Sequence, residues 1–379
     1  MRKNHLLAPG PTPVPAKVLE AMARPLMHHR TSDFEVLFEE IRRGLSWLYQ
    51  DKGDVITLAA TGSGGMEACV ANLTSPGELV MVVEGGKFGE RWTEICRAYK
   101  MDPDVLSVEW GHSVDLDELH SRLSKRHHRA VFVQASETST GAKHDIEKLS
   151  KMVRGVSPET LVVVDAITAL GVYNFQPLEW GLDAVVTGSQ KALMLPPGLA
   201  FVWLSERAWA TAEKAKSPRF YFDLQIERKN QRKNTTAWTP AISLVYGLQV
   251  ALKMMQKEGL ENMFARHARL ACGTRMAIQA LGLEIFPKDL LSEAVTVISV
   301  PKGIDGNAIP KIMQRKQGVT IAGGQSKLSG KIFRIGHLGY VDESDILIAI
   351  NGIENTLSFL GYPLEKGMAL AAAQEVFKI

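Results

Sequence analysis

A glycine-rich segment, TGSGG at residues 61–65, follows one apolar run and precedes another, MEACVANL. If a helix begins here, its first backbone N–H groups and the positive end of its dipole are available to an anion such as a phosphate. The segment lacks a Gly-Lys-Ser/Thr ending, which argues against a nucleotide-binding P-loop. A plain glycine-rich turn between a strand and a helix is the alternative, because short glycine motifs are common.

Two charged residues are placed next to runs that are typical of buried strands. Asp165 directly follows LVVV at 161–164, and the carboxyl ends of such strands are where open α/β sheets bind ligands. Lys191 lies in GSQKALMLPPG, between the apolar runs at 183–186 and 198–204. Burial lowers the pKa of a lysine, as an imine-forming amine requires. Taken singly, Asp165 could cap a turn and Lys191 could be solvated.

Together the three features match the needs of one cofactor, pyridoxal 5′-phosphate (PLP). Its phosphate needs N–H donors, its aldehyde needs an amine, and its pyridine nitrogen needs an anion so that the ring can withdraw electrons. The spacing from Asp165 to Lys191 leaves room for one short connection and one strand, so both can reach one edge of a sheet. We therefore predict that Lys191 holds PLP as a Schiff base and that Asp165 holds its pyridine nitrogen.

The elements that must position these residues follow an alternation of strand-like and helix-like stretches, which is typical of a mainly parallel α/β sheet. We expect strands in DVITLAA, ELVMVV, AVFVQA, LVVVDA, DAVVTGS and GLAFVWL, and helices at 34–49, 66–73, 88–99 and 146–153. After Pro240 we expect helices at 242–258 and 260–281, the strand AVTVISV, a helix at 307–315, a turn at 323–324, the strand KIFRIG and a helix at 342–360. These elements predict a Pro-rich extended arm at 1–16, a large PLP-binding domain at 17–258 and a smaller C-terminal α+β domain at 259–379.

The composition is that of a globular protein, with 379 residues, 22% of them charged, and a formal net charge of +3. This mild, interleaved charge predicts no nucleic-acid or membrane partner. Three distant cysteines suit neither a disulfide framework nor a metal site, and the N-terminal apolar run is too short for a signal peptide. We expect a cytoplasmic protein without a metal.

Seven motifs, in order along nearly the whole chain, resemble the class V aminotransferases: APGPTPVP, TGSGGMEA, ETSTG, VVVDAITALG, GSQKAL-x-x-PPGLA, TPAISL and FRIGHLG. The similarity is strongest to the alanine–glyoxylate and serine–pyruvate group. The resemblance implies a fold-type I PLP-dependent transferase that forms a homodimer with shared active sites. It also implies ping-pong transfer of an amino group from alanine or serine to glyoxylate or pyruvate.

The resemblance further implies roles for individual positions. Arg334 matches the arginine that binds the substrate α-carboxylate, whose two oxygens suit the planar guanidinium; a surface arginine on an edge strand is the alternative. His28, His29 and Arg30 receive no role. The positions that match cofactor contacts are Lys191, Asp165, Ser63, Gly64, Gly65, Phe88, Thr138, Gln190 and, from the partner subunit, Thr236 and Thr239. Phe88 could instead be core, and Thr138 could cap a turn.

Two other functions are weighed against transamination. A PLP lyase of the cysteine desulfurase type needs a nucleophilic cysteine on a mobile loop, but Cys69, Cys96 and Cys272 fall in predicted helices and the loop at 317–331 has none. A PLP-fold subunit of a larger redox assembly is the second alternative. A purely structural subunit would not need all three cofactor-binding features.

Overall fold

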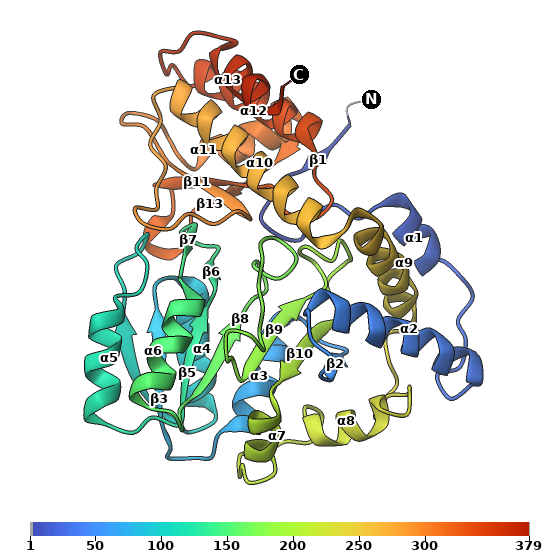
Figure 1. The fold of residues 1–379 in the computed structure, drawn as a ribbon. Helices are drawn as coiled ribbons and strands as arrows, with labels where there is room; N and C mark the ends of the chain where they lie inside the picture. The colour runs from blue at the N-terminus through green and yellow to red at the C-terminus, as the bar shows by residue number, and fades with distance from the viewer. Residues whose placement is uncertain (1–2, 379) are drawn as a thin grey trace.

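The computed structural model describes residues 3–378, and its largest feature is a seven-stranded sheet (Figure 1). The strand order is β2-β10-β9-β8-β5-β3-β4. β10 is antiparallel to both of its neighbours and the other pairs are parallel, so the prediction of a mainly parallel sheet is confirmed. The strands are β2 (Val55–Leu58), β3 (Leu79–Glu84), β4 (Asp102–Ser107), β5 (Ala130–Gln134), β8 (Leu161–Asp165), β9 (Ala184–Gly188) and β10 (Ala200–Leu204).

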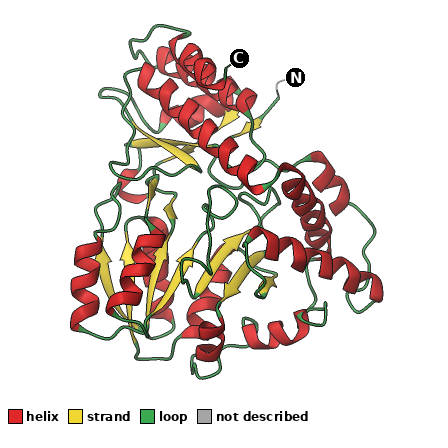
Figure 2. Ribbon diagram, in the orientation of Figure 1, coloured by secondary structure: helices red, strands yellow, loops and turns green. Residues whose placement is uncertain are grey.

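Helices cover both faces of this sheet (Figure 2), because its central strands are apolar on both sides. One core packs the sheet against α1 (Ala16–Met22), α2 (Ser32–Leu48), α5 (Leu116–Lys125), α6 (Ile146–Val156) and α9 (Ile242–Glu258). The other core packs it against α3 (Gly62–Leu73), α4 (Lys87–Ala98), α7 (Glu206–Ala212) and α8 (Leu224–Gln231). The predicted helices at 34–49, 88–99, 146–153 and 242–258 thus correspond to α2, α4, α6 and α9.

The C-terminal part of the chain forms its own core beside the sheet (Figure 1). There β14 (Ile332–Gly336) lies between β11 (Val295–Ser299) and β13 (Ala322–Gly323), antiparallel to both. The helices that pack with this sheet are α10 (Leu260–Ala280), α12 (Glu343–Phe359) and α13 (Met368–Phe377). The helix expected at 307–315 is instead a short α11 (Ala308–Ile312) that is continued by a π-helical turn, Met313–Gln317. Residue 323, expected in a turn, ends β13 instead. We propose residue 258, the end of α9, as the domain boundary.

The Pro-rich arm runs extended from the C-terminal part toward the central sheet. β1 (His5–Leu6) pairs with β12 (Val319–Thr320), and Leu7 is buried in the C-terminal core. The Gly336 amide donates to Leu7 O at 2.7 Å. The Thr12 amide donates to Gln190 O at 3.2 Å, so the arm connects the small sheet to the loop that carries Lys191.

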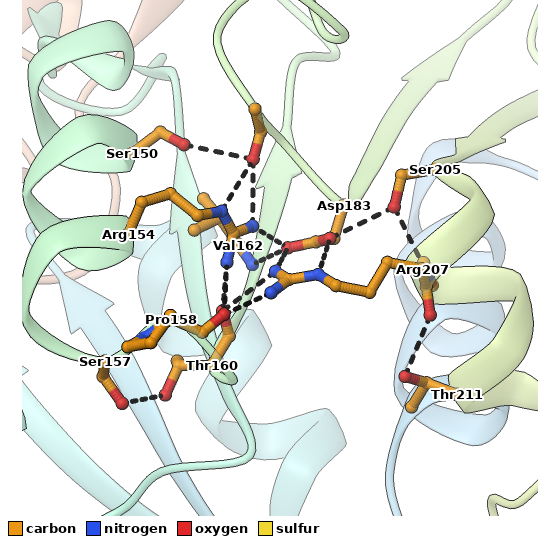
Figure 3. Close-up of polar contacts among 12 residues, drawn as sticks. Ser150, Arg154, Ser157, Pro158, Thr160, Val162, Asp183, Ser205, Arg207 and Thr211 are labelled. Atoms are coloured by element: carbon orange, nitrogen blue, oxygen red, sulfur yellow. Dashed lines mark hydrogen bonds and ion pairs between the residues drawn. The ribbon is translucent and has the colours of Figure 1, made fainter.

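A buried carboxylate, Asp183, braces the amino edge of the sheet (Figure 3). Asp183 directly precedes β9 and accepts from the Val162 amide at 2.7 Å and from Arg207 Nη2 at 2.6 Å, and it also pairs with Arg154. This edge is opposite to the one where Asp165 ends β8, so we assign Asp183 to stabilising the fold. No helix within residues 3–378 is both long and apolar enough to cross a membrane.

Candidate active site

Lys191 lies in the loop between β9 and β10, and only 8% of the residue is exposed. Its Nζ donates to Pro9 O at 2.5 Å, and its carbonyl accepts from the Thr12 hydroxyl at 3.0 Å. Any side chain at Gly10 would collide with the amine. Burial lowers the pKa of Lys191 to about 8, although the charge of Asp165 acts in the opposite direction. The amine is therefore neutral at mildly alkaline pH, as a nucleophilic lysine requires.

Asp165 ends β8 at the carboxyl edge of the sheet and is 4% exposed. Burial raises the pKa of Asp165 to about 7, while the Ile167 amide, which donates to Oδ1 at 2.8 Å, and the positive charges of Arg91 and Lys191 oppose this shift. Asp165 lies opposite Val186 in the parallel pair β8–β9, and Lys191 follows the end of β9 by three residues, so both residues lie at the carboxyl edge of the sheet. Within residues 3–378, no hydrogen bond is made to Asp165 Oδ2, which leaves this oxygen for a ligand.

The predicted anion cradle is the N-terminus of α3, which begins at Gly62. Thr61 provides no side-chain cap, and within residues 3–378 the amides of Gly62 and Ser63 have no hydrogen-bond partner, so these two N–H groups of the first turn remain available. A Cβ at Gly62 would lie 2.4 Å from Ile167 Cδ1, so the loop after Asp165 packs directly on the cradle. A Cβ at Gly188 would lie 3.0 Å from Gln190 Oε1 and 3.5 Å from Gly62 N. The Gln190 side chain therefore also lies near the start of α3.

Ser63, Gly64 and Gly65 have different surroundings within this turn. Ser63 Oγ accepts from Arg91 Nη1 at 3.0 Å, and the amides of Gly64 and Gly65 donate to Thr61 O at 2.8 and 3.2 Å. A Cβ at Gly65 would lie 2.7 Å from a methyl group of Val186 in β9, and one at Gly64 would lie 2.8 Å from Ala60 Cβ. Both glycines thus let α3 approach its neighbours closely.

Phe88 lies in the first turn of α4 and is held by a residue that we did not predict, Glu137. The Glu137 side chain is fully buried and accepts from the amides of Phe88 and Gly89 at 3.1 and 3.0 Å and from the Ser139 amide at 3.1 Å. Burial raises the pKa of Glu137, although these hydrogen bonds oppose the shift. Phe88 is half-buried, with Arg91 5.0 Å from its ring centroid. The ring is therefore partly accessible at the edge of the site.

Arg334 lies in the middle strand of the small sheet and is 6% exposed, so the alternative of a surface arginine on an edge strand is wrong. Its Nε donates to Gly323 O at 2.9 Å and its Nη1 to Thr138 O at 3.2 Å. Burial lowers the pKa of Arg334 to about 10, and the charge of Glu137 opposes this. The Thr138 hydroxyl bonds to that of Thr168 at 3.0 Å, close after Asp165 in the chain. Arg334 thus reaches the site from the C-terminal part.

Thr236 and Thr239 are not joined to this cluster by any hydrogen bond within residues 3–378. Thr236 is buried and its hydroxyl donates to Trp238 O at 2.6 Å, whereas Thr239 is exposed. Arg30 donates to the Thr235 hydroxyl at 2.9 Å, so the unassigned 28–30 segment holds the same loop. A role for these threonines therefore depends on a second subunit.

The fold and the site together define an α/β enzyme of the fold-type I PLP-dependent class. A buried amine, a buried carboxylate and an uncapped helix start meet at the carboxyl edge of a mainly parallel sheet. The chain belongs to the class V aminotransferase family, whose model matches residues 5–341.

Similarity to known proteins extends over the whole chain. A relative from Synechococcus sp., described as the small subunit of a soluble hydrogenase, is 42% identical over 99% of this chain and 98% of its own. A serine–glyoxylate aminotransferase of Arabidopsis thaliana is 34% identical over 98% of this chain and 94% of its own. The crystal structure of ureidoglycine–glyoxylate aminotransferase from Bacillus subtilis superposes with a TM-score of 0.93 at 29% identity and covers 100% of this chain and 99% of that one. The protein is a PLP-dependent aminotransferase.

The residues present fit PLP. Gln190 Oε1 is buried and, within residues 3–378, has no hydrogen-bond partner, so a 180° rotation of the amide would place an N–H donor there. A Cβ at Gly188 would contact both this atom and Gly62 N, so the amide lies near the start of α3, where a phosphate would lie. In the same part of the chain, no three His, Cys, Asp or Glu side chains are grouped as metal ligands would be.

Proposed function

We propose that the protein transfers the amino group of alanine or serine to glyoxylate or pyruvate by a ping-pong mechanism. The observation that supports this proposal is the meeting of buried Lys191 and Asp165 beside the start of α3, with Arg334 approaching through Thr138. The donors and acceptors follow the family resemblance and the serine–glyoxylate and ureidoglycine–glyoxylate enzymes to which the chain is similar.

Bound PLP supplies an electron sink for negative charge at the substrate Cα. In this proposal Lys191 Nζ would carry the proton that leaves the substrate Cα, because its lowered pKa favours the neutral amine. Asp165 would hold the pyridine nitrogen of the cofactor and would favour its protonated form. Arg334 binds the α-carboxylate shared by every donor and acceptor, and its two backbone contacts fix the guanidinium plane.

The remaining contacts hold the cofactor. We assign the phosphate to the start of α3, at Ser63, Gly64 and Gly65, with Gln190 beside it, and one face of the ring to Phe88. We assign Thr138 to a position near the ring, and its hydrogen bond to Thr168, three residues after Asp165, supports this assignment. We also propose a homodimer in which Thr236 and Thr239 of one subunit complete the phosphate site of the other.

The positions of the three cysteine thiols favour a lyase of the desulfurase type less than they favour a transaminase. Cys69 and Cys96 are buried in α3 and α4, and burial raises the pKa of both, that of Cys96 to about 12. Cys272 is exposed but lies within α10. All three are free, which suits the reducing cytoplasm where we place the protein.

The relative described as a hydrogenase subunit makes assembly with a redox enzyme a second candidate function. Co-purification of the full chain with a redox partner, without conversion of any amino acid, would favour it. Against it, Lys191, Asp165 and Arg334, the residues that we assign to the cofactor and the substrate, are all buried.

Absorbance spectra of the purified holoenzyme with alanine, serine, aspartate and cysteine test the proposal. A transaminase converts the bound cofactor to its pyridoxamine form when the donor alone is added, and glyoxylate or pyruvate restores the starting spectrum. Release of sulfide from cysteine without such conversion would favour the lyase. Conversion by aspartate but not by alanine or serine would refute the proposed donors.

A further inference from the structure

Arg91, in α4, is a half-buried cation at the edge of the site for which we predicted no role. Its Nη1 donates to Ser63 Oγ at 3.0 Å, and its guanidinium carbon lies 5.0 Å from the centre of the Phe88 ring. It therefore contacts one residue of the proposed phosphate cradle and the residue proposed to stack on the cofactor ring. One side chain joins the starts of α3 and α4.

The charge of Arg91 is not neutralised by a neighbour. Within residues 3–378, no carboxylate lies at ion-pair distance from its guanidinium, and the charge of Asp165 acts on it only at longer range. Glu90 pairs with Lys87, and Glu67 accepts from the Tyr99 hydroxyl at 2.8 Å. A partly buried arginine without a counterion favours the binding of an anion at this place.

The cradle also lacks a cation of its own. The first turn of α3 contains no Lys or Arg, so it offers N–H groups and the helix dipole, together equivalent to about half a unit charge. A phosphate monoester carries about two negative charges at pH 7. Because Arg91 lowers the pKa of both Asp165 and Lys191, its field also extends across the site.

We propose that Arg91 is a further cofactor-binding residue, which supplies the positive charge that the α3 cradle lacks and pairs with the PLP phosphate beside Ser63. This inference rests on the proposed position of the cofactor. Two contributions to cofactor binding can then be separated. The phosphate group pairs with the charge of Arg91, whereas the pyridine ring stacks on Phe88.

The test compares two ligands that differ only in the phosphate. The dissociation constants of PLP and of pyridoxal are measured for the full-length apoenzyme by absorbance titration, in wild type, Arg91→Gln and Arg91→Lys. We expect Arg91→Gln to weaken PLP about 10- to 100-fold, as for loss of one hydrogen bond to a charged group, and to change pyridoxal less than about threefold. Arg91→Lys should restore part of the affinity, since it keeps the charge but not the planar fork.

Arg97→Gln is the matched control, because Arg97 is an exposed arginine in the last turn of the same helix. It should leave both dissociation constants unchanged. In a double-mutant cycle with Ser63→Ala, the effects on PLP should be non-additive, since both residues would act on one phosphate. The inhibition constant of inorganic phosphate against PLP binding should be higher in Arg91→Gln than in wild type.

Several results would overturn the inference. Equal weakening of PLP and pyridoxal would show that Arg91 acts only through Phe88 or the fold, and unchanged constants would show no role. An unchanged constant for PLP with a raised KM for aspartate, but not for alanine, would place Arg91 at the substrate side chain. Wild-type protein that binds no PLP would overturn the proposed function as well, whereas attachment to a lysine other than Lys191 would overturn only the proposed site.

Discussion

Replacing Arg334 tests the proposed substrate contact most directly, because every donor and acceptor carries the same α-carboxylate. The Arg334 residue is 6% exposed, and hydrogen bonds to Gly323 O and Thr138 O fix the plane of its guanidinium. Loss of one member of a buried, hydrogen-bonded charge pair typically costs about 2–5 kcal/mol. We therefore expect Arg334→Ala to lower kcat/KM by about one and a half to four decades, at about 1.4 kcal/mol per decade.

The assay follows both half-reactions by stopped-flow absorbance, with alanine and then with glyoxylate. Both should slow by similar factors, because the lost contact is common to both substrates, and Arg334→Lys should recover only part of the rate. The two lost backbone contacts also predict a fall of about 1–3 kcal/mol in the free energy of unfolding, to be measured separately by thermal denaturation. Arg269→Ala, a half-exposed arginine of α10, serves as the control. Unchanged kcat/KM in both Arg334 variants would refute the reasoning and move the carboxylate site elsewhere.

Four further predictions concern the cofactor. Lys191→Ala should abolish turnover, and borohydride reduction of the wild type followed by peptide mapping should label Lys191; a different labelled lysine would contradict us. Because burial lowers the pKa of Lys191 to about 8, the rate of covalent attachment of PLP to the apoenzyme should rise with pH up to about 8 and then level off. For an exposed lysine, this rate would continue to rise up to a pH of about 10.4. Asp165→Asn should lower kcat by about two to three decades, the range for losing one electrostatic contact in an active site, while PLP stays bound; a near-normal kcat would exclude the assignment. Thr239→Ala should weaken PLP binding only in the dimer, and a fully active monomer in sedimentation velocity would refute the shared site.

The parts of the fold that the sequence predicted are those with a strong local pattern. The fully buried runs of β5, β8 and β9 and the periodic helices α2, α4 and α9 were predicted within a few residues. β4 (Asp102–Ser107) was not predicted, because it is the edge strand of the sheet. Its sequence, DPDVLS, contains a proline and charged residues, and most of its residues are at least partly exposed. Edge strands need fewer apolar residues, so periodicity carries less information there.

The residues of the candidate site also divide into those with a local sequence pattern and those without one. Lys191 and Asp165 could be predicted because each adjoins a buried strand, whereas Arg91 and Glu137 could not. Arg91 lies in the charged stretch GERW, where nothing in the local sequence distinguishes it from a solvated helix residue. Its contact with Ser63 joins two helices that meet only in the folded chain. Long-range contacts of this kind have no signature in a single sequence.

Glu137 shows why such contacts matter for the chemistry. Its carboxylate accepts from the amides at the start of α4 and thereby fixes Phe88. Its charge raises the pKa of Asp165 and opposes the lowering of the pKa of Arg334 by burial. Because these effects act on the residues that we assign to the ring, the pyridine nitrogen and the substrate carboxylate, a change at Glu137 cannot affect one proposed contact alone. The site is therefore one coupled electrostatic unit, and the separate contributions of Arg91, Asp165 and Arg334 can be measured only by comparing ligands that differ in a single group.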